Sequence, residues 1–199
     1  MEKAIQCFDL NLKGKTALDV GASTGGFTDC MLQYGAAKVF AVDVGHGQLD
    51  RSLLEDSRVV NLEGTNIKDI KPEDLGLLPD LISIDVSFIS LKKVLPYLLP
   101  FVSTKTDILC LLKPQFEIGR TNKGVVRQLQ DHKKVLRDML EWLGRQGFFV
   151  WGLDFSPVLG SEGNIEFLMY IKTLGPGIRA DDLQVAENAH KKLKVRLGD

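Results

Sequence analysis

Three charged residues of this 199-residue chain stand where an apolar run ends or is interrupted. Asp85 ends the run LISID, Lys113 ends DILCLLK, and Glu166 is the central residue of IEF. Charged groups at such positions are costly unless they are paired or functional. A strand-end turn or a salt bridge would account for any one of them. Two carboxylates and a lysine together would suit a site that moves a proton.

The elements that must position these residues are predicted from periodicity. Short runs that are apolar at most positions indicate parallel strands covered on both faces. Helical spacing indicates helices over 27–34 and 129–143. Two more strands are joined by SPVLGSEG, which is too short for a crossover helix and predicts an antiparallel pair. The predicted strands cover 16–20, 38–43, 58–62, 80–85, 107–112, 147–155 and 164–172.

This order of elements predicts a Rossmann-like α/β fold, with a seven-stranded, mostly parallel sheet and an antiparallel last strand. The carboxyl ends of the fourth and fifth strands would face one crevice, so Asp85 and Lys113 should meet there. The reversed last strand would bring Glu166 to the same rim.

A glycine-rich turn, GASTGG, follows the first strand. A dinucleotide fingerprint requires G-x-G-x-x-G, but Ser23 stands at the second glycine, where backbone would approach a pyrophosphate. The pattern Asp19-x-Gly21-x-x-x-Gly25 is instead typical of a loop that holds the amino acid end of S-adenosylmethionine (SAM). The predicted contacts of this loop are Gly21, Ala22, Ser23, Thr24, Gly25 and Gly26.

The ends of the next strands complete the predicted SAM site. Asp43 could accept hydrogen bonds from both ribose hydroxyls, and Gly45 would let backbone pass close to the ligand. Asn66 could offer its amide to the adenine edge and Ile67 an apolar face, while Asp85 would close the crevice. A glycine turn that merely packs a helix against a strand remains the alternative for each piece taken alone.

Composition restricts the function classes. The net charge of −1 does not indicate a nucleic-acid-binding protein, so any RNA contact must come from a local patch. Segment 113–127 has four basic residues, one acidic residue and two glycines, which predicts a mobile basic loop. Arg120, Lys123 and Arg127 are candidate phosphate contacts, with a solvated loop as the equal alternative.

Other features argue against metal sites and membranes. Cys7, Cys30 and Cys110 form no C-x-x-C pair, and the three histidines lack ligand spacing, so no metal site is predicted. The most apolar window, 94–102, is far short of the roughly 20 residues of a membrane span. No signal peptide is recognised at the start, and a cytoplasmic location is expected.

Five stretches together resemble a known family: ALDVGASTGGFTDCML, AVDVGHGQLD, LISIDVSFISL, LLKPQFEIG and GNIEFLMYIK. They resemble the FtsJ-like methyltransferase domain of the TlyA, or hemolysin A, family of ribosomal RNA 2′-O-methyltransferases. The resemblance implies a Lys-Asp-Lys-Glu catalytic tetrad whose last three places fall on Asp85, Lys113 and Glu166. It implies methyl transfer from SAM to a ribose 2′-hydroxyl, usually of cytidine, with ribosomal RNA or ribosomal subunits as the partner.

The resemblance predicts a methyltransferase domain over 1–174, followed by a helical tail over 175–199. The R-G-G-x-K-L segment that carries the family's first lysine is absent before Glu2, as is the family's S4-type RNA-binding domain. Lys3 could substitute for that lysine or lie on a helix surface. The domain could therefore bind SAM yet be inactive alone.

Two other function classes are weighed against this interpretation. Methylation of a base would call for an Asn-Pro-Pro-Tyr type motif or a cysteine after the fourth strand, and the chain has neither there. A membrane-active protein would need an amphipathic or spanning helix, and no such pattern is recognised.

Overall fold

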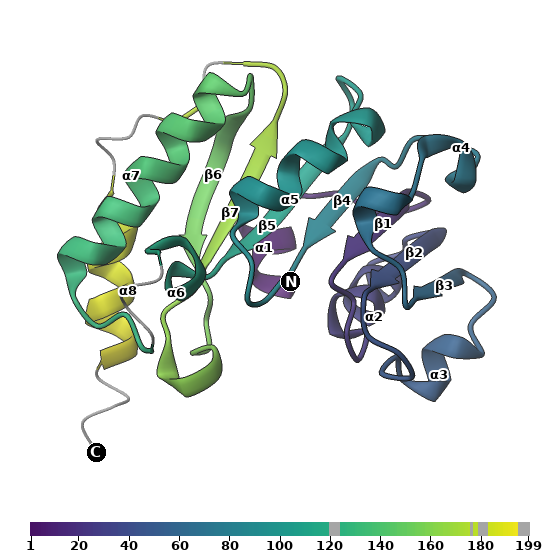
Figure 1. Cartoon of the computed structure of the whole chain (residues 1–199), viewed down its shortest axis with the longest axis horizontal. Helices are drawn as coiled ribbons and strands as arrows, with labels where there is room; N and C mark the ends of the chain where they lie inside the picture. The colour runs from purple at the N-terminus through teal and green to yellow at the C-terminus, as the bar shows by residue number, and fades with distance from the viewer. Residues whose placement is uncertain (120–123, 176, 179–182, 195–199) are drawn as a thin grey trace.

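A computed structural model, shown in Figure 1, describes residues 1–119, 124–175, 177–178 and 183–194. Its centre is a seven-stranded sheet with the order β3-β2-β1-β4-β5-β7-β6. Neighbouring strands are parallel except at β7, which is antiparallel to both β5 and β6. The strands are β1 (Thr16–Val20), β2 (Lys38–Asp43), β3 (Val59–Glu63), β4 (Leu81–Ile84), β5 (Asp107–Leu112), β6 (Phe149–Phe155) and β7 (Phe167–Lys172). The predicted fold class and the reversed last strand are confirmed.

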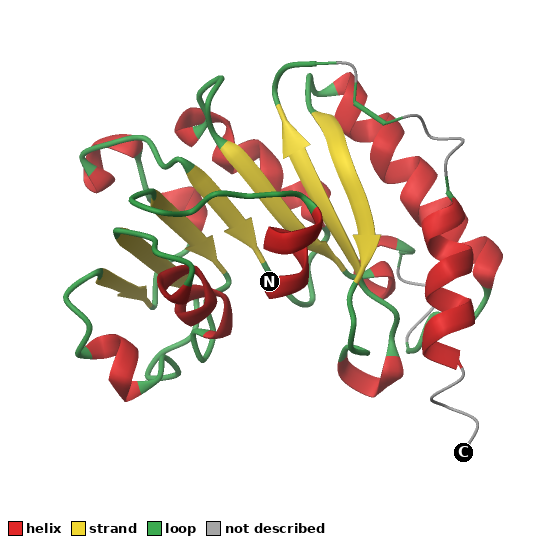
Figure 2. Ribbon diagram, turned by 180° about the vertical axis from the view of Figure 1, so that it is seen from behind, coloured by secondary structure: helices red, strands yellow, loops and turns green. Residues whose placement is uncertain are grey.

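Helices cover both faces of the sheet, and Figure 2 shows it from the face that carries α1. Side chains of α1, α2 and α3 join one buried cluster, and those of α5, α7 and α8 join another on the opposite face. The helices are α1 (Glu2–Cys7), α2 (Gly26–Gln33), α3 (Arg51–Leu54), α4 (Pro72–Leu75), α5 (Leu91–Leu98), α6 (Pro114–Glu117), α7 (Leu129–Arg145) and α8 (Gln184–Lys194), with short 3-10 turns η1 (Ile67–Asp69), η2 (Leu99–Phe101) and η3 (Ser161–Gly163).

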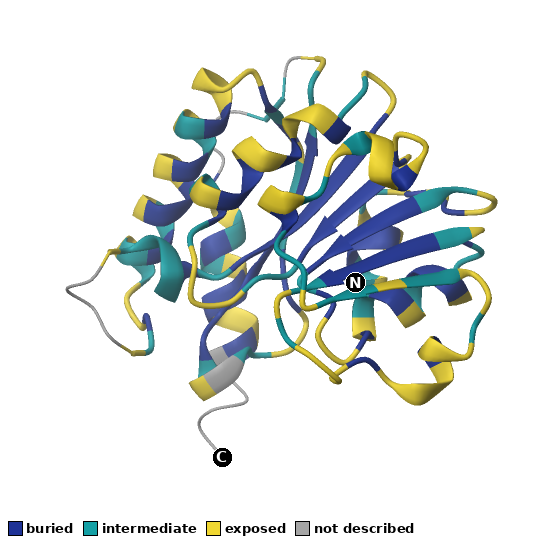
Figure 3. Cartoon of the chain, turned by 45° about the vertical axis from the view of Figure 1, so that its right-hand side comes forward, coloured by how far each residue is buried: buried dark blue, intermediate teal, exposed yellow. Residues whose placement is uncertain are grey.

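Burial explains why the strand patterns are continuous rather than alternating. Every residue of β4 and β5 is buried, because helices lie on both sides of these central strands (Figure 3). On α7 the inward stripe includes Val135, Leu136 and Met139. Two layers of helices therefore hold the sheet firmly and leave its carboxyl edge to the loops.

Two local predictions are corrected. Glu166 is not inside the last strand but immediately precedes β7, where its carbonyl accepts a 2.8 Å hydrogen bond from the Ser156 amide. Part of the predicted loop 113–127 is helix α6, because Pro114 suits the first turn of a helix. Within the helical tail predicted over 175–199, the structure describes helix α8 over Gln184–Lys194.

The strand register brings the three charged residues to one edge of the sheet. Leu112, the last residue of β5, pairs with Phe167, the first residue of β7. Lys113 therefore follows β5 at the edge where Glu166 precedes β7. Asp85 follows β4 at the same edge, where its amide donates to the Val20 carbonyl at 2.9 Å.

Candidate active site

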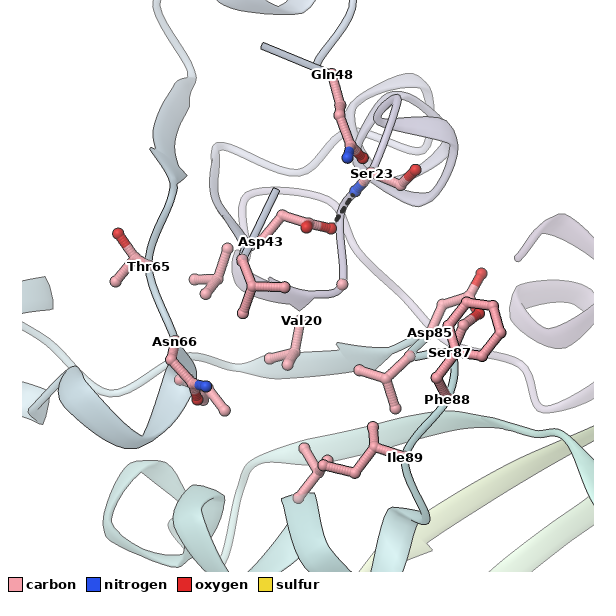
Figure 4. A pocket seen from close by; sticks show the side chains of 16 residues that line it. Val20, Ser23, Asp43, Gln48, Thr65, Asn66, Asp85, Ser87, Phe88 and Ile89 are labelled. Carbon is pink, nitrogen blue, oxygen red and sulfur yellow. Dashed lines mark hydrogen bonds between the residues drawn. The ribbon is translucent and has the colours of Figure 1, made fainter. Parts of the chain in front are cut away.

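A cavity of about 600 Å³ opens at the carboxyl ends of β1, β2 and β4 (Figure 4). Six of the predicted SAM contacts line it: Gly21, Ser23, Asp43, Asn66, Ile67 and Asp85. The other predicted contacts, Ala22, Thr24, Gly25, Gly26 and Gly45, are not among the lining residues. They belong to the turns that support it.

Position 21 requires glycine because the backbone of Asp85, in the loop after β4, passes close to it. The φ of Gly21 is +86°, and a Cβ at this position would lie 2.3 Å from the Asp85 carbonyl oxygen. Gly25 has a φ of +97°, and a Cβ there would lie 2.1 Å from the Leu53 side chain. The first glycine thus joins the turn to the loop after β4, and the second lets α3 pack beneath it.

Asp43 ties two loops together at the wall of the cavity. Its Oδ2 accepts from the Ser23 amide at 2.8 Å, and its Oδ1 accepts from the Gly45 amide at 2.7 Å. The Asp43–Ser23 bond is drawn in Figure 4. A carboxylate offers about four acceptor sites, so two amide donors leave capacity for ligand hydroxyls.

Asn66 begins the turn η1 on another wall of the cavity. Its Oδ1 accepts from the Lys68 amide at 3.2 Å, which orients the side-chain carboxamide. The preceding Thr65 amide donates to the Asp43 carbonyl at 2.9 Å, so the two walls are joined by backbone. The carboxamide NH₂ of Asn66 can then serve as a donor to a ligand.

Beneath the glycine turn lies a fully buried carboxylate, Asp19. Its two oxygens accept from Ser83 Oγ and Thr28 Oγ1, each at 2.7 Å. Burial raises the pKa of Asp19 to about 6, although both hydroxyl donors oppose the change. Asp19 therefore connects β1, β4 and the first turn of α2 under the cavity.

The charged residues converge beside this cavity. Lys113 Nζ lies 2.6 Å from Asp85 Oδ1 and donates to Ser87 Oγ at 3.0 Å. Glu166 is only 7% exposed; burial raises its pKa, while the Lys113 ammonium opposes the increase. A Cβ on Gly160 would lie 2.1 Å from Glu166 Oε1, so the link between β6 and β7 needs glycine to admit this carboxylate.

The remaining predicted residues are placed as follows. Arg120 and Lys123 lie outside the described residues, and Arg127 is exposed just before α7. Lys3 does not join Asp85 and Lys113; its Nζ lies 2.9 Å from Asp154 Oδ2 and donates to the Phe155 carbonyl at 2.6 Å. Lys3 is thus held against β6 rather than lying on the solvent face of α1.

Among the described residues, neither the histidines nor the helices form a further candidate site for a metal ion or a membrane. His132 Nδ1 and His190 Nε2 are 2.8 Å apart and join α7 to α8. Within the described ranges, no group of three or more His, Cys, Asp or Glu residues could hold a metal ion. In the same part of the chain, no helix is both long and apolar enough to cross a bilayer.

The model of the FtsJ-like methyltransferase family matches residues 1–173. The chain belongs to this family.

The sequence comparison finds close relatives of this FtsJ-like domain. One is 43% identical over 209 residues, "Putative rRNA methyltransferase YqxC" of Bacillus subtilis; the match covers 100% of the chain and 74% of that protein. Another is the 16S/23S rRNA (cytidine-2′-O)-methyltransferase TlyA of Mycobacterium tuberculosis, 43% identical over 173 residues. That match covers 85% of the chain and 65% of TlyA. The resemblance to the TlyA and hemolysin family is thereby confirmed.

A solved structure agrees with this assignment. "Putative hemolysin from Streptococcus thermophilus" superposes with a TM-score of 0.92 at 43% identity, covering 100% of the chain and 74% of that structure. The chain therefore corresponds to about three quarters of that relative's length.

Sequence reasoning did not find two aromatic residues at the site of this FtsJ-like domain. Phe88 lines the cavity, is 92% exposed, and has a φ of 65°, which is strained for a bulky residue. Its ring centroid lies 5.2 Å from that of Phe116 on α6. The run DVSFIS contains Phe88 but carries no signal that its ring would face solvent.

A second feature that sequence reasoning missed is the position of Glu117. Its Oε2 accepts from Ser90 Oγ at 2.6 Å, and its Oε1 accepts from the Leu91 amide at 2.7 Å. Burial raises the pKa of Glu117. Glu117 thereby fixes α6, which follows Lys113, to the start of α5, which follows the Asp85 loop.

Gln115 was missed as well. Its side chain hydrogen-bonds to Glu166, and its buried Oε1 has no hydrogen-bond partner among the described residues. The segment KPQFE thus contributes a lysine and an amide beside Glu166, a ring against Phe88, and a carboxylate that holds the start of α5.

Proposed function

We propose that this domain transfers the methyl group of SAM to a ribose 2′-hydroxyl of ribosomal RNA, with cytidine as the target nucleoside. The observation that carries the proposal is the meeting of Lys113, Asp85 and Glu166 beside the cavity. The activity by which the TlyA relative is named, cytidine 2′-O-methylation of 16S and 23S rRNA, supports the choice of ribose and of cytidine.

The cavity offers groups that match the parts of SAM. Gly21 lines the cavity without a side chain to fill it, Asp43 has acceptor capacity for ribose hydroxyls, and Asn66 has a donor for an adenine edge. Ile67 and Val86 give apolar surface to the same space. When SAM is bound, its sulfonium supplies the electrophilic methyl group.

The residues of the chain would handle the proton and the geometry. The 2′-hydroxyl is a weak nucleophile until its proton is being lost, and the amine of Lys113 in its neutral form could accept that proton. Asp85 Oδ1 and Ser87 Oγ fix the position of Lys113 Nζ. Because Asp85 also lines the cavity, it places the proton acceptor next to the cofactor.

The exposed aromatic pair supports a nucleoside substrate. Phe88 presents its ring at the mouth of the cavity, supported by Phe116. Unpaired bases stack on such rings, and this would hold the ribose near Lys113. The strained φ of Phe88 is consistent with a residue placed for a ligand rather than for packing.

One observation favours a second candidate, a SAM-binding domain that does not turn over alone. The position of Lys3 against Asp154 means that it does not supply the family's first lysine in this structure. In that case the domain binds SAM, but methyl transfer requires the upstream segment with the R-G-G-x-K-L sequence.

A product analysis tests the proposal. The protein is incubated with ribosomal subunits and SAM, and the RNA is digested to nucleosides for mass spectrometry. The expected product is 2′-O-methylcytidine; a methyl group on a base or on protein would contradict the assignment. Lys113→Ala should abolish methylation and leave SAM affinity within about twofold, because Lys113 does not line the cavity. Repeating the assay with the upstream segment present separates the two candidates.

A further inference from the structure

A second cavity, of about 480 Å³, adjoins the first between η1 and α5. The two cavities share four lining residues, Asn66, Ile67, Ile89 and Val94, so they lie next to each other. Asn66 and Ile89 can be found in Figure 4, at the edge of the first cavity. The second cavity thus begins where the proposed adenine end of the SAM site stops.

This second cavity, here called the η1–α5 groove, is basic. Lys68, Lys92 and Lys93 line it, and none of its lining residues is acidic. Within the described part of the chain, none of these three lysines has an ion-pair partner within 4.0 Å, whereas Lys15 and Lys133 each have one. Three positive charges gathered on a protein of net charge −1 point to an anionic ligand.

The groove also offers surface suited to bases. Tyr97 on α5 is 50% exposed, and Ile89 is 39% exposed. A stacking ring beside lysines is the combination by which proteins hold single-stranded nucleic acid, whereas a duplex keeps its base faces stacked and inaccessible. A purely anionic partner, such as an acidic protein segment, would not need the exposed ring.

We infer that the η1–α5 groove binds a single-stranded stretch of RNA that flanks the target nucleotide. The inference rests on the proposed function for its biological substrate, but binding can be measured separately from methylation. The lysines would contact phosphates and Tyr97 would stack on a base. The RNA would then cross the outer wall of the SAM cavity on its way to Phe88.

The binding test uses a fluorescein-labelled single-stranded RNA of about twelve nucleotides, followed by anisotropy over a range of salt concentrations. For the double variant Lys92→Gln/Lys93→Gln, the slope of log binding constant against log salt concentration should become less negative by about 1.4. Each of the two phosphate contacts to a single strand contributes about 0.7 to that slope. Tyr97→Ala should weaken binding at least about fivefold, and Tyr97→Phe should bind like the wild type. SAM affinity should stay unchanged in every variant.

The matched control is Lys134→Gln/Arg137→Gln, which removes two positive charges from exposed positions of α7. It should keep the wild-type slope and affinity. The inference is overturned if this control and the groove variants lose affinity equally, or if the groove variants bind RNA like the wild type. It is also overturned if duplex RNA or polyglutamate displaces the labelled strand as well as unlabelled single strand does.

The two proposals can fail separately. If the RNA product carries no 2′-O-methyl group but the groove variants lose binding as expected, the proposed function fails and the groove stands. If 2′-O-methylation is found and the groove variants keep the wild-type KM and RNA affinity, the inference that the groove binds RNA is wrong and the proposed function is supported.

Discussion

Replacing Asp19 by asparagine tests the account of the buried carboxylate beneath the cavity. Burial raises the pKa of Asp19 from its ordinary value of 3.8 to about 6. This difference of about two pKa units corresponds to roughly 3 kcal/mol between the folded and unfolded states. The folded state holds the proton of Asp19 more tightly than the unfolded state does. The contribution of this protonation to the free energy of unfolding is therefore fully present below about pH 4 and is lost as the pH rises to about 6.

Asp19→Asn has no charge to bury, so its free energy of unfolding should lack this decrease. An amide can accept from one of the two hydroxyls, Ser83 or Thr28, while the other hydroxyl turns to accept from the amide NH₂. A poor geometry in either of these hydrogen bonds should lower the free energy of unfolding of the variant by about 1–2 kcal/mol at every pH. Between pH 4 and pH 7, the free energy of unfolding of Asp19→Asn should therefore rise by roughly 3 kcal/mol relative to that of the wild type.

The assay is urea unfolding at several pH values from 4 to 8, followed by circular dichroism. Ser83→Ala serves as the opposite perturbation, because it removes a donor that favours the ionised carboxylate of Asp19. The pH dependence should be flatter in Asp19→Asn and steeper in Ser83→Ala. If the wild type and Asp19→Asn lose stability in parallel between pH 4 and 6, the reasoning is refuted.

Three further substitutions address the cavity and its support. Asp43→Ala should lower SAM affinity at least about tenfold, since charge-assisted hydrogen bonds contribute about 1.5–3 kcal/mol; equal affinities in calorimetry would contradict the role of Asp43. Gly21→Ala should abolish SAM binding while the protein stays folded by circular dichroism, because the new Cβ would force the turn away from the Asp85 carbonyl. Glu117→Ala should lower the free energy of unfolding by about 1.5–3 kcal/mol, because its hydrogen bonds to Ser90 and the α5 amide are lost. It should also reduce kcat more than SAM affinity. A variant with wild-type stability and kcat would show that Glu117 does not hold α6 against α5.

Sequence reasoning succeeded where local patterns determine the structure. The continuous apolar runs identified β4 and β5, and their ends placed Asp85 and Lys113 at one edge of the sheet. The short link before the last strand fixed its direction, which brought Glu166 to the same edge. Each of these predictions depended on a few neighbouring residues.

The predictions that failed or were missing depend on residues far apart in the chain. The bonds of Glu117 to Ser90 and Leu91, and the approach of His132 to His190, join segments whose relative position only packing determines. The exposure of Phe88 likewise follows from a positive φ that its neighbours do not signal. Lys3 illustrates the same limit, since its partner Asp154 belongs to the other end of the chain.

The distribution of site residues along the chain divides the domain into two parts. Among the described residues, the cavity proposed for SAM is lined only by residues from Val20 to Val94, whereas Lys113 and Glu166 come later and depend on β5, β6 and β7. Evolution or an engineer could therefore alter the groups proposed to handle the proton of the methyl acceptor while the residues that line the cavity stay the same. A library confined to residues after Val94 would vary the surroundings of Lys113 and Glu166 and leave every described residue that lines the cavity, Phe88 included, unchanged.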